Sequence, residues 1–470
     1  MDLELKDGVL LKYSGNEKNV VIPLGVKHIA PKAFCGNPCI AGIVIPEGVT
    51  SIGRCTFMDM RNLKSVVIPS SVTAIRAEAF YGCDSLCSVE LPEDLSVIEK
   101  HAFGFCKSLL GITIPSGVTE IDPAAFVCCS KLDRIDVSPE NKTYVSIDGV
   151  VYNKEKTKLL IYPNGRRQSV FTIPDGVMEI DANVFRDNQV IERIVFPRDM
   201  TIINFRLFYR CRSLRSVVLP ERLEIIGKDT FRYCQNLVGI QLPDGVIGLG
   251  KGAFCGCKKL LSATIPDSVE VILDSAFEAC ESLESIIIPD SVKEIGIGVF
   301  DRCYHLKDIK LPHGMTRIPE SMFRYCTALE SITLPDSVKT IDAYAFVSCF
   351  ELKSLRLPAS VTNIETGAFQ SSGLEHIEIP DSVREIGTAA FSHCTQLERA
   401  ILYSGLEQIG GLAFDNCRSL KNVTIPDSVK EIGQEAFAHC HKDFTIIGKT
   451  GSKAERYAKE NGILFKELKE

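Results

Sequence analysis

Apolar residues recur along this chain in a sequence motif of 23 residues that is repeated with few interruptions. In residues 63–86 the motif begins with apolar positions at the spacing of a β-strand that buries one face. Pro69 ends this strand because it has no N–H to donate, and a second short inward-facing segment follows. Residues 76–80 then predict a helical or 3₁₀ turn. The inward positions of this repeat unit are Leu63, Val66, Ile68, Val72, Ile75, Phe80 and Cys83.

A phenylalanine occupies the same position in each of seventeen units. A fixed period in the twenties lets each unit bury its apolar face only against its neighbours, so the pattern predicts a solenoid. Stacked phenylalanine rings are expected to form the spine of its core. The periodic residues are Phe34, Phe57, Phe80, Phe103, Phe126, Phe185, Phe208, Phe231, Phe254, Phe277, Phe300, Phe323, Phe346, Phe369, Phe391, Phe414 and Phe437.

Cysteine follows the same period, since thirteen of the nineteen cysteines stand three residues after the periodic phenylalanine. Cysteines at one repeat position predict a ladder inside the solenoid, where a free thiol packs as a small apolar group. Cysteines of neighbouring coils, with Cα atoms ~4.8 Å apart, would be close enough to form disulfides. Disulfide formation would, however, divide a uniform row of cysteines into separate pairs. We therefore expect reduced, buried cysteines.

The 23-residue motif resembles the repeat motif of the BspA-like leucine-rich repeat proteins, whose units carry the same I-P-x-S-V-x-x-I-G-x-x-A-F-x-x-C sequence. The resemblance covers residues from about 23 to 440, apart from one insertion. It implies a right-handed leucine-rich repeat stack, mainly β with short helical or 3₁₀ turns, with a parallel sheet along one face. It also implies protein binding, often in surface adhesins of microbes. Where the general pattern has asparagine, this chain has serine or glycine, as at Ser71 and Gly117, so no asparagine ladder is expected.

The spacing of the repeats is broken once, because Phe126 and Phe185 are 59 residues apart, one period plus 36 residues. The extra segment predicts a β-hairpin at residues 148–163, and residues 7–23 predict a similar one at the N-terminus. The expected organisation is an N-terminal capping hairpin at 1–22, a leucine-rich repeat array of five units at 23–137, an inserted hairpin at 138–170, an array of twelve units at 171–443 and a C-terminal cap with a helix at 444–470.

The C-terminal helix is predicted from the capping-box spacing of Ser452 and Glu455, with an end at Asn461 before Gly462. One unit is shorter than the others, since Phe369 and Phe391 are 22 residues apart, and Tyr403 stands where a proline is expected. The sheet is expected to kink there.

Composition excludes several classes of function. A net charge of −7 and a pI of about 5.8 do not fit a nucleic-acid-binding protein, which would carry a basic face. No run of 18 apolar residues is present, so no membrane insertion is expected. The N-terminus lacks the basic start and apolar run of a signal peptide, which predicts a cytoplasmic protein. A secreted or cell-surface location is the alternative if a leader segment precedes this sequence.

Motifs that could carry chemistry are explained by the repeat. Residues 245–251 match G-x-x-x-x-G-K, but Gly252 replaces the Ser or Thr that would bind Mg²⁺. The segments His439–His441 and Cys255–Cys257 each lack the second ligand pair of a structural zinc site. No nucleophile motif is present. We expect no catalytic, cofactor or metal site, and therefore no enzyme.

The outward positions of each strand lie five, four and two residues before the proline, and they are the positions left free to bind a partner. The row two before the proline is rich in β-branched residues. This enrichment fits β-propensity on a pleated surface, and it also fits an apolar groove that receives a polypeptide. The candidate partner-binding residues of this row are Val44, Val67, Val195, Val218 and Ile287.

Charge varies along the repeats, with a basic zone at 193–232 and an acidic zone at 267–294. Such zones can steer and orient a charged partner, so Arg212 and Arg215 are further candidates. The sequence thus predicts a non-catalytic, monomeric module that binds a protein or peptide along the solenoid, with an adhesin-like surface role as a further expectation. A structural spacer and a glycan-binding or glycan-processing protein are the alternatives.

Overall fold

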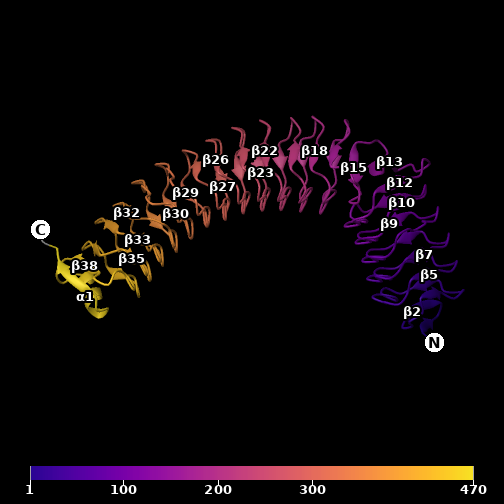
Figure 1. Cartoon of the computed structure of the whole chain (residues 1–470), viewed down its shortest axis with the longest axis horizontal. Helices are drawn as coiled ribbons and strands as arrows, with labels where there is room; N and C mark the ends of the chain where they lie inside the picture. The colour runs from indigo at the N-terminus through magenta and orange to yellow at the C-terminus, as the bar shows by residue number, and fades with distance from the viewer. Residues whose placement is uncertain (1, 469–470) are drawn as a thin grey trace. The chain divides into compact units, whose positions relative to one another are not determined.

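The computed structural model describes residues 2–468 and comprises two compact units, Met1–Pro220 and Glu221–Glu470. Within each unit the chain forms successive coils of a solenoid, and the strands follow one another in sequence order (Figure 1). Strands of neighbouring coils pair in parallel, as β5 (Gly42–Val44) does with β7 (Ser65–Val67). The predicted leucine-rich repeat solenoid is therefore confirmed.

The first strand of each coil has three or four residues and ends close to the proline position. Its middle residue is buried and its flanking residues point outward, as the exposed–buried–exposed pattern of β7 shows. In the first unit these strands are β3 (Asn19–Val21), β5, β7, β10 (Gly111–Ile114), β12 (Arg134–Val137), β16 (Val170–Thr172), β18 (Arg193–Val195) and β20 (Ser216–Val218). In the second unit they are β22 (Gly239–Gln241), β24 (Ser262–Thr264), β26 (Ser285–Ile287), β28 (Asp308–Lys310), β32 (His376–Ile379), β34 (Arg399–Leu402), β36 (Asn422–Thr424), β38 (Thr445–Gly448) and β39 (Leu464–Glu467).

A second strand of two residues follows in most coils and ends in an aliphatic residue, usually isoleucine, which is buried in all of these strands except at the half-buried Ile295. In the first unit these strands are β4 (His28–Ile29), β6 (Ser51–Ile52), β8 (Ala74–Ile75), β9 (Val97–Ile98), β11 (Glu120–Ile121), β17 (Glu179–Ile180) and β19 (Ile202–Ile203). In the second unit they are β21 (Ile225–Ile226), β23 (Gly248–Leu249), β25 (Val271–Ile272), β27 (Glu294–Ile295), β29 (Arg317–Ile318), β30 (Thr340–Ile341), β31 (Asn363–Ile364), β33 (Glu385–Ile386), β35 (Gln408–Ile409) and β37 (Glu431–Ile432).

The third side of each coil consists of consecutive tight turns rather than a helix. In the coil that contains Phe80, the N–H of Tyr81 donates to the carbonyl of Glu78 at 3.2 Å. Glu78 and Gly82 have φ of 59° and 73°, in the left-handed region, which prevents the turns from continuing as a 3₁₀ helix. The N–H of Phe80 donates to the carbonyl of Ala102 in the next coil at 2.7 Å, so this side is also held to its neighbours.

Stacked phenylalanine rings form the spine of the core in each unit, as the sequence predicts. In the first unit Phe80 and Phe103 have ring centroids 5.2 Å apart and nearly parallel planes. In the second unit Phe300 and Phe323 are 6.1 Å apart, and both rings are fully buried. Tyr13 continues the stack at the N-terminal end, 5.3 Å from its neighbouring phenylalanine.

The predicted C-terminal helix is α1 (Lys453–Glu460), and it covers the last coil. The hydroxyl of Ser452 accepts from the N–H of Glu455, while the carboxylate of Glu455 accepts from the N–H of Gly451 at 2.7 Å. Tyr457 on this helix lies edge-on to Phe437, with ring centroids 6.1 Å apart. The strand β39 after the helix is not predicted by the sequence, and it pairs in parallel with β38.

The N-terminal hairpin is formed by strands other than those expected. β1 (Leu3–Lys6) pairs antiparallel with β2 (Val9–Tyr13), whereas β3, the expected partner of β2, pairs in parallel with β5. The expected pairing of residues 7–11 with 20–23 is therefore wrong, because β3 already belongs to the first ordinary coil. The outermost positions of the expected terminal segments, residues 1 and 469–470, lie outside the described residues.

The inserted segment contains an antiparallel meander of three strands. β13 (Tyr144–Ile147) pairs with β14 (Val150–Asn153), and β14 pairs with β15 (Lys158–Ile161). β15 then pairs in parallel with β17, so the repeat resumes directly from the insertion. The division of the repeats into arrays of five and twelve units at this segment stays a prediction.

The sheet of first strands is interrupted within each unit. Residues 88–91 in the first unit and residues 331–334 and 354–357 in the second unit occupy first-strand positions but form no strand. The last of these segments is joined to β32 by a single bridge, from Ser354 to His376. It precedes the 22-residue repeat, where the sequence predicts a kink.

Candidate functional site

The outward row two residues before the proline is aligned across neighbouring coils of the first unit. Val21, Val44 and Val67 lie in register on β3, β5 and β7. Their exposed fractions are 69%, 38% and 56%, so the three side chains form one apolar strip on the solvent face. Val21 was not among the residues singled out from the sequence, although it precedes Pro23 by the same two positions.

Val195 and Val218 extend the row on another part of the first unit, in register with Thr172 on β16. Val218 is exposed and Val195 is half-buried. Val195 also lines a pocket of about 550 Å³ together with Thr172, Met178 and Pro197. The remaining candidate, Ile287, belongs to the second unit, where it is 63% exposed at the end of β26.

The two candidate arginines lie at the surface of the first unit. Arg212 is exposed and follows the core residue Cys211. The guanidinium of Arg215 lies 3.4 Å from the carboxylate of Glu192 on the preceding coil, and both side chains are exposed. An exposed pair of this kind contributes little to stability, so Arg215 can exchange Glu192 for a partner's carboxylate at small cost.

The acidic zone of the second unit is more neutral than its sequence suggests. Four of the eight acidic side chains at residues 267–294 pair with lysine or arginine of a neighbouring coil. The pairs are Glu270 with Lys293, Asp274 with Lys251, Glu278 with Arg302 and Glu281 with Lys258. A hydrogen bond from the N–H of Ile297, together with Lys251, holds the pKa of Asp274 below its ordinary value. The sequence could not show this pairing before the register of the coils was known.

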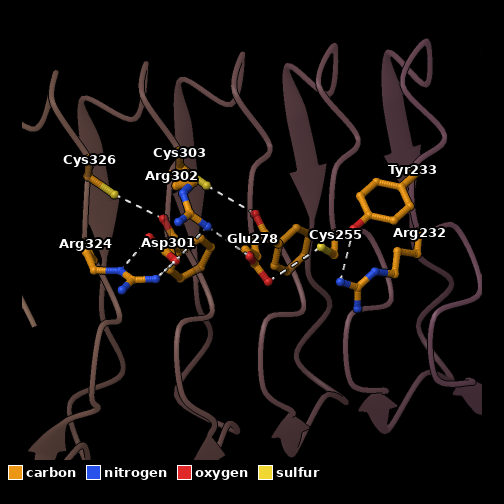
Figure 2. Close-up of polar contacts among 11 residues, drawn as sticks. Arg232, Tyr233, Cys255, Glu278, Asp301, Arg302, Cys303, Arg324 and Cys326 are labelled. Atoms are coloured by element: carbon orange, nitrogen blue, oxygen red, sulfur yellow. Dashed lines mark hydrogen bonds and ion pairs between the residues drawn. The ribbon is translucent and has the colours of Figure 1, made fainter. Parts of the chain in front are cut away.

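Figure 2 shows polar side chains that cross successive coils of the second unit, one or two residues after the periodic phenylalanine. The carboxylate of Glu278 lies 3.6 Å from the thiol of Cys255 on the preceding coil. The guanidinium of Arg302, on the following coil, lies 3.4 Å from the same carboxylate. Glu278 therefore joins three coils.

Asp301 continues these contacts and is almost fully buried. Its two carboxylate oxygens accept from Nη2 and Nε of Arg324, at 2.5 and 3.1 Å, in a bidentate arrangement. This hydrogen bonding raises the pKa of Arg324 above its ordinary value. The guanidiniums of Arg302 and Arg324 each lie 5.8 Å from the ring centre of Tyr325. Because both carboxylates are bound by arginines of the chain, these contacts cross-link coils rather than form an acid–base pair.

The cysteine ladder has a hydrogen-bonding role that the sequence does not reveal. All nineteen cysteines are free thiols. The thiol of Cys83 donates to the carbonyl of Phe57 in the preceding coil at 3.2 Å, and Cys106 donates to Phe80 at the same distance. The thiol thus fills a small core space and also satisfies a buried carbonyl.

Cys303 in this ladder should resist alkylation in the folded protein, whereas the exposed Cys35 and Cys87 should react. Burial raises the pKa of the ladder thiols, to about 12 for Cys129 and to about 11 for Cys394, so little reactive thiolate forms at pH 8. We expect iodoacetamide to label Cys87 at least ~100-fold faster than Cys303, measured by peptide mass mapping. In denaturant all nineteen cysteines should be labelled; equal native rates at Cys87 and Cys303 would contradict a buried ladder.

The segments that resembled other sites are parts of ordinary coils. Lys251 of the G-x-x-x-x-G-K segment pairs with Asp274 at 3.1 Å. His439 and Cys440 bind different groups, a carboxylate oxygen of Asp415 and the carbonyl of Phe414. Within residues 2–468, no cluster of three or more His, Cys, Asp or Glu side chains is arranged to hold a metal ion.

A pocket of about 440 Å³ lies at the interruption of the sheet in the second unit. Its lining includes Arg356, His376, Glu378 and Tyr403. Sequence reasoning did not identify it as a site. The available signals were the 22-residue repeat and the tyrosine at a proline position, which predict a kink but not the space that opens beside it.

Comparison with known families identifies the repeat. The family described as BspA type leucine rich repeat region matches residues 13–149, 164–272, 224–349 and 316–443. The chain belongs to the BspA-type leucine-rich repeat family. Members of the leucine-rich repeat class generally serve as protein-interaction and surface modules, and they are typically non-catalytic.

Solved structures similar to this BspA-type chain include several bacterial repeat proteins. The pneumococcal vaccine antigen PcpA aligns with a TM-score of 0.53 at 23% identity, over 62% of this chain and 86% of PcpA, which supports the fold. A leucine-rich repeat protein from Bacteroides ovatus is 26% identical, with a TM-score of 0.43 over 98% of this chain and 94% of that one. A leucine rich cell surface protein from Faecalibacterium prausnitzii is also 26% identical, with a TM-score of 0.43, over 70% of this chain and 91% of that one.

No curated protein is similar enough to this BspA-type chain to count as a match. Among the helices in the described part of the chain, none has the length and apolar character needed to cross a bilayer.

Proposed function

We propose that this BspA-type chain is a non-catalytic module that binds a protein or peptide against the outward face of its first strands. The observation that carries the proposal is the aligned apolar strip of Val21, Val44 and Val67, whose side chains are exposed on three paired strands. Contiguous exposed apolar surface on a soluble protein often marks a binding site. The general use of leucine-rich repeats in protein interaction supports the same function.

The proposed contact residues are β-branched members of the row, Val44, Val67, Val195 and Val218 in the first unit and Ile287 in the second unit. Arg212 and Arg215 would orient an acidic part of the partner, because exposed arginines steer association more than they strengthen it. The protein would act as a monomer. Display at a cell surface in an adhesin-like role is compatible with this function and stays a prediction.

Val67→Lys should weaken partner capture at least ~10-fold, because an ammonium group inside an apolar contact loses its hydration without gaining a partner. Leu24→Lys is the matched control, since Leu24 is 86% exposed in the loop beside β3 and lies off the strand face. The measurement is quantitative capture by immobilised wild-type and variant chains from the same cell extract. Equal capture by both variants would contradict binding at the strip.

Reversing both arginines, Arg212→Glu with Arg215→Glu, tests the basic zone in the same assay. We expect the partner to be captured more slowly by the variant, and the captured amount to depend less on salt concentration, because the long-range attraction between the arginines and the partner is removed. Unchanged association would exclude the zone from binding. Loss of capture after glycosidase treatment of the extract would favour a glycan-binding protein, and no capture by any chain would favour a structural spacer.

A further inference from the structure

The pocket of the second unit opens where two neighbouring coils separate. Most neighbouring first strands of this unit pair over two or more residues, as β26 and β28 do over three. Residues 354–357 instead meet β32 only at the bridge from Ser354 to His376. The next coil is one residue shorter, because Leu374 follows Ser372 by two positions where Leu352 follows Cys349 by three. The missing residue shifts one coil against the next, and the space beside β32 results.

Two opposite charges at this pocket remain without an ion-pair partner. Arg356 and Glu378 occupy equivalent positions on neighbouring coils, two residues before Pro358 and Pro380. Within residues 2–468, neither side chain forms an ion pair within 4.0 Å, and both line the pocket. In this unit opposite charges at equivalent positions of neighbouring coils otherwise often pair. Examples are Lys251 with Asp274 at 3.1 Å, Lys258 with Glu281 at 2.8 Å and Lys430 with Glu407 at 2.5 Å.

The remaining lining of the pocket is largely apolar. Leu357, Ala359 and Pro380 contribute aliphatic surface, and Tyr403 contributes a half-exposed ring at the position where other coils have proline. A volume of about 440 Å³ falls in the ordinary range for ligand pockets. The site therefore combines an apolar cavity with one cationic and one anionic side chain, each available to a ligand.

We propose that this pocket is a docking site for a polypeptide segment that places a large apolar side chain between an acidic and a basic residue. The apolar side chain would fill the cavity against Tyr403, the acidic residue would bind Arg356 and the basic residue would bind Glu378. The proposal rests on the proposed function and locates a specific anchor for it in the second unit.

Charge complementarity favours a polypeptide over a small solute, because Arg356 and Glu378 can bind an acidic and a basic residue of the same peptide. Residues 355–357 lie outside any strand, and a single bridge at Ser354 joins this segment to β32. The positions of the guanidinium and the carboxylate on successive coils then select the order of charges along the peptide.

A random peptide library displayed on phage, selected against the full-length chain, tests the proposal. We expect enriched sequences to carry an aromatic or large aliphatic residue flanked by an acid and a base. One enriched peptide, synthesised with a fluorophore, should bind Arg356→Glu and Glu378→Arg at least ~10-fold more weakly by fluorescence anisotropy. The double variant, with both charges exchanged, should instead prefer the peptide in which the acid and the base are exchanged.

Lys310→Glu is the matched control, because Lys310 is an exposed cation of the same row but lies outside the pocket. It should bind the peptide like wild type, and the melting temperature of each variant shows whether it is folded. The pocket proposal would be overturned if the wild type, Arg356→Glu and the charge-exchanged variant all bound the peptide equally.

Different results would contradict the pocket proposal and the proposed function. If enriched peptides bind but are weakened by Val67→Lys and not by Arg356→Glu, the outward strip binds polypeptides and the pocket proposal is overturned. If no polypeptide is enriched and none is captured from extract, both proposals are overturned.

Discussion

Phe300→Ala is expected to lower the free energy of unfolding of the second unit by about 3–5 kcal/mol. The ring is fully buried and stacks between Phe277 and Phe323, with centroid distances of 5.7 and 6.1 Å. Truncation removes its burial and leaves a cavity that the neighbouring rings, held by their own backbone ladders, cannot close. Denaturant unfolding measures the total loss, and hydrogen exchange locates it.

Because coils of a solenoid contact only their neighbours, protection should fall most in residues 277–346 and little near α1. Phe350→Ala is the control, since Phe350 is a half-exposed phenylalanine of the same unit outside the spine. It should change stability by no more than about 0.5 kcal/mol. Wild-type stability and protection in Phe300→Ala would show that the stacked rings do not support the core.

Gly373→Ala should destabilise the second unit by about 3 kcal/mol, at the upper end of the usual cost of overpacking. A Cβ at this position would lie 1.8 Å from the carbonyl oxygen of Phe350 on the preceding coil. The obstructing atom belongs to the backbone, so neither a rotamer change nor a small shift relieves the overlap. Gly373 is the single residue between Ser372 and Leu374, where full-length units have two residues.

Gly314→Ala provides the matched control for this substitution. Gly314 lies in the same unit, and no heavy atom lies within 4 Å of the position that a Cβ would occupy there. Its φ is not positive. It should keep or slightly raise the melting temperature, because alanine restricts the unfolded chain. If Gly373→Ala melts at the wild-type temperature, the 22-residue coil does not depend on this close approach.

The local outcomes show which parts of the fold could be predicted from sequence. The periodic Phe80 and Phe103, the strand before Pro69 and the cap of α1 were predictable, because each follows from a pattern contained within one repeat. The pairing of β1 with β2 was not, since residues 7–11 and 20–23 have similar strand character and only the fold decides which partner is used. The thiol of Cys83 was predicted to be buried, but its hydrogen bond to the Phe57 carbonyl depends on the exact stagger of two coils.

Some features of the candidate site could likewise be predicted from the sequence, and others could not. The outward positions of Val44 and Val67 followed from strand alternation and a fixed proline, and their exposure in the structure agrees with that placement. Whether they bind a partner stays a prediction. The pairing of Arg215 with Glu192, and the unpaired Arg356 and Glu378, could not be predicted, because they depend on distances between coils.

The sequence by itself determined the repeat, its reduced core cysteines, its capping helix and the identity of the outward positions. A 23-residue period specifies which residues of one coil face its neighbours, and each of these features depends only on that periodicity. The tertiary structure alone decided where the sheet of first strands is interrupted, which charges neutralise one another and where a pocket opens. These properties depend on the stagger between successive coils, and a one-residue change such as the short repeat before Phe391 alters that stagger without disturbing the pattern that specifies the fold.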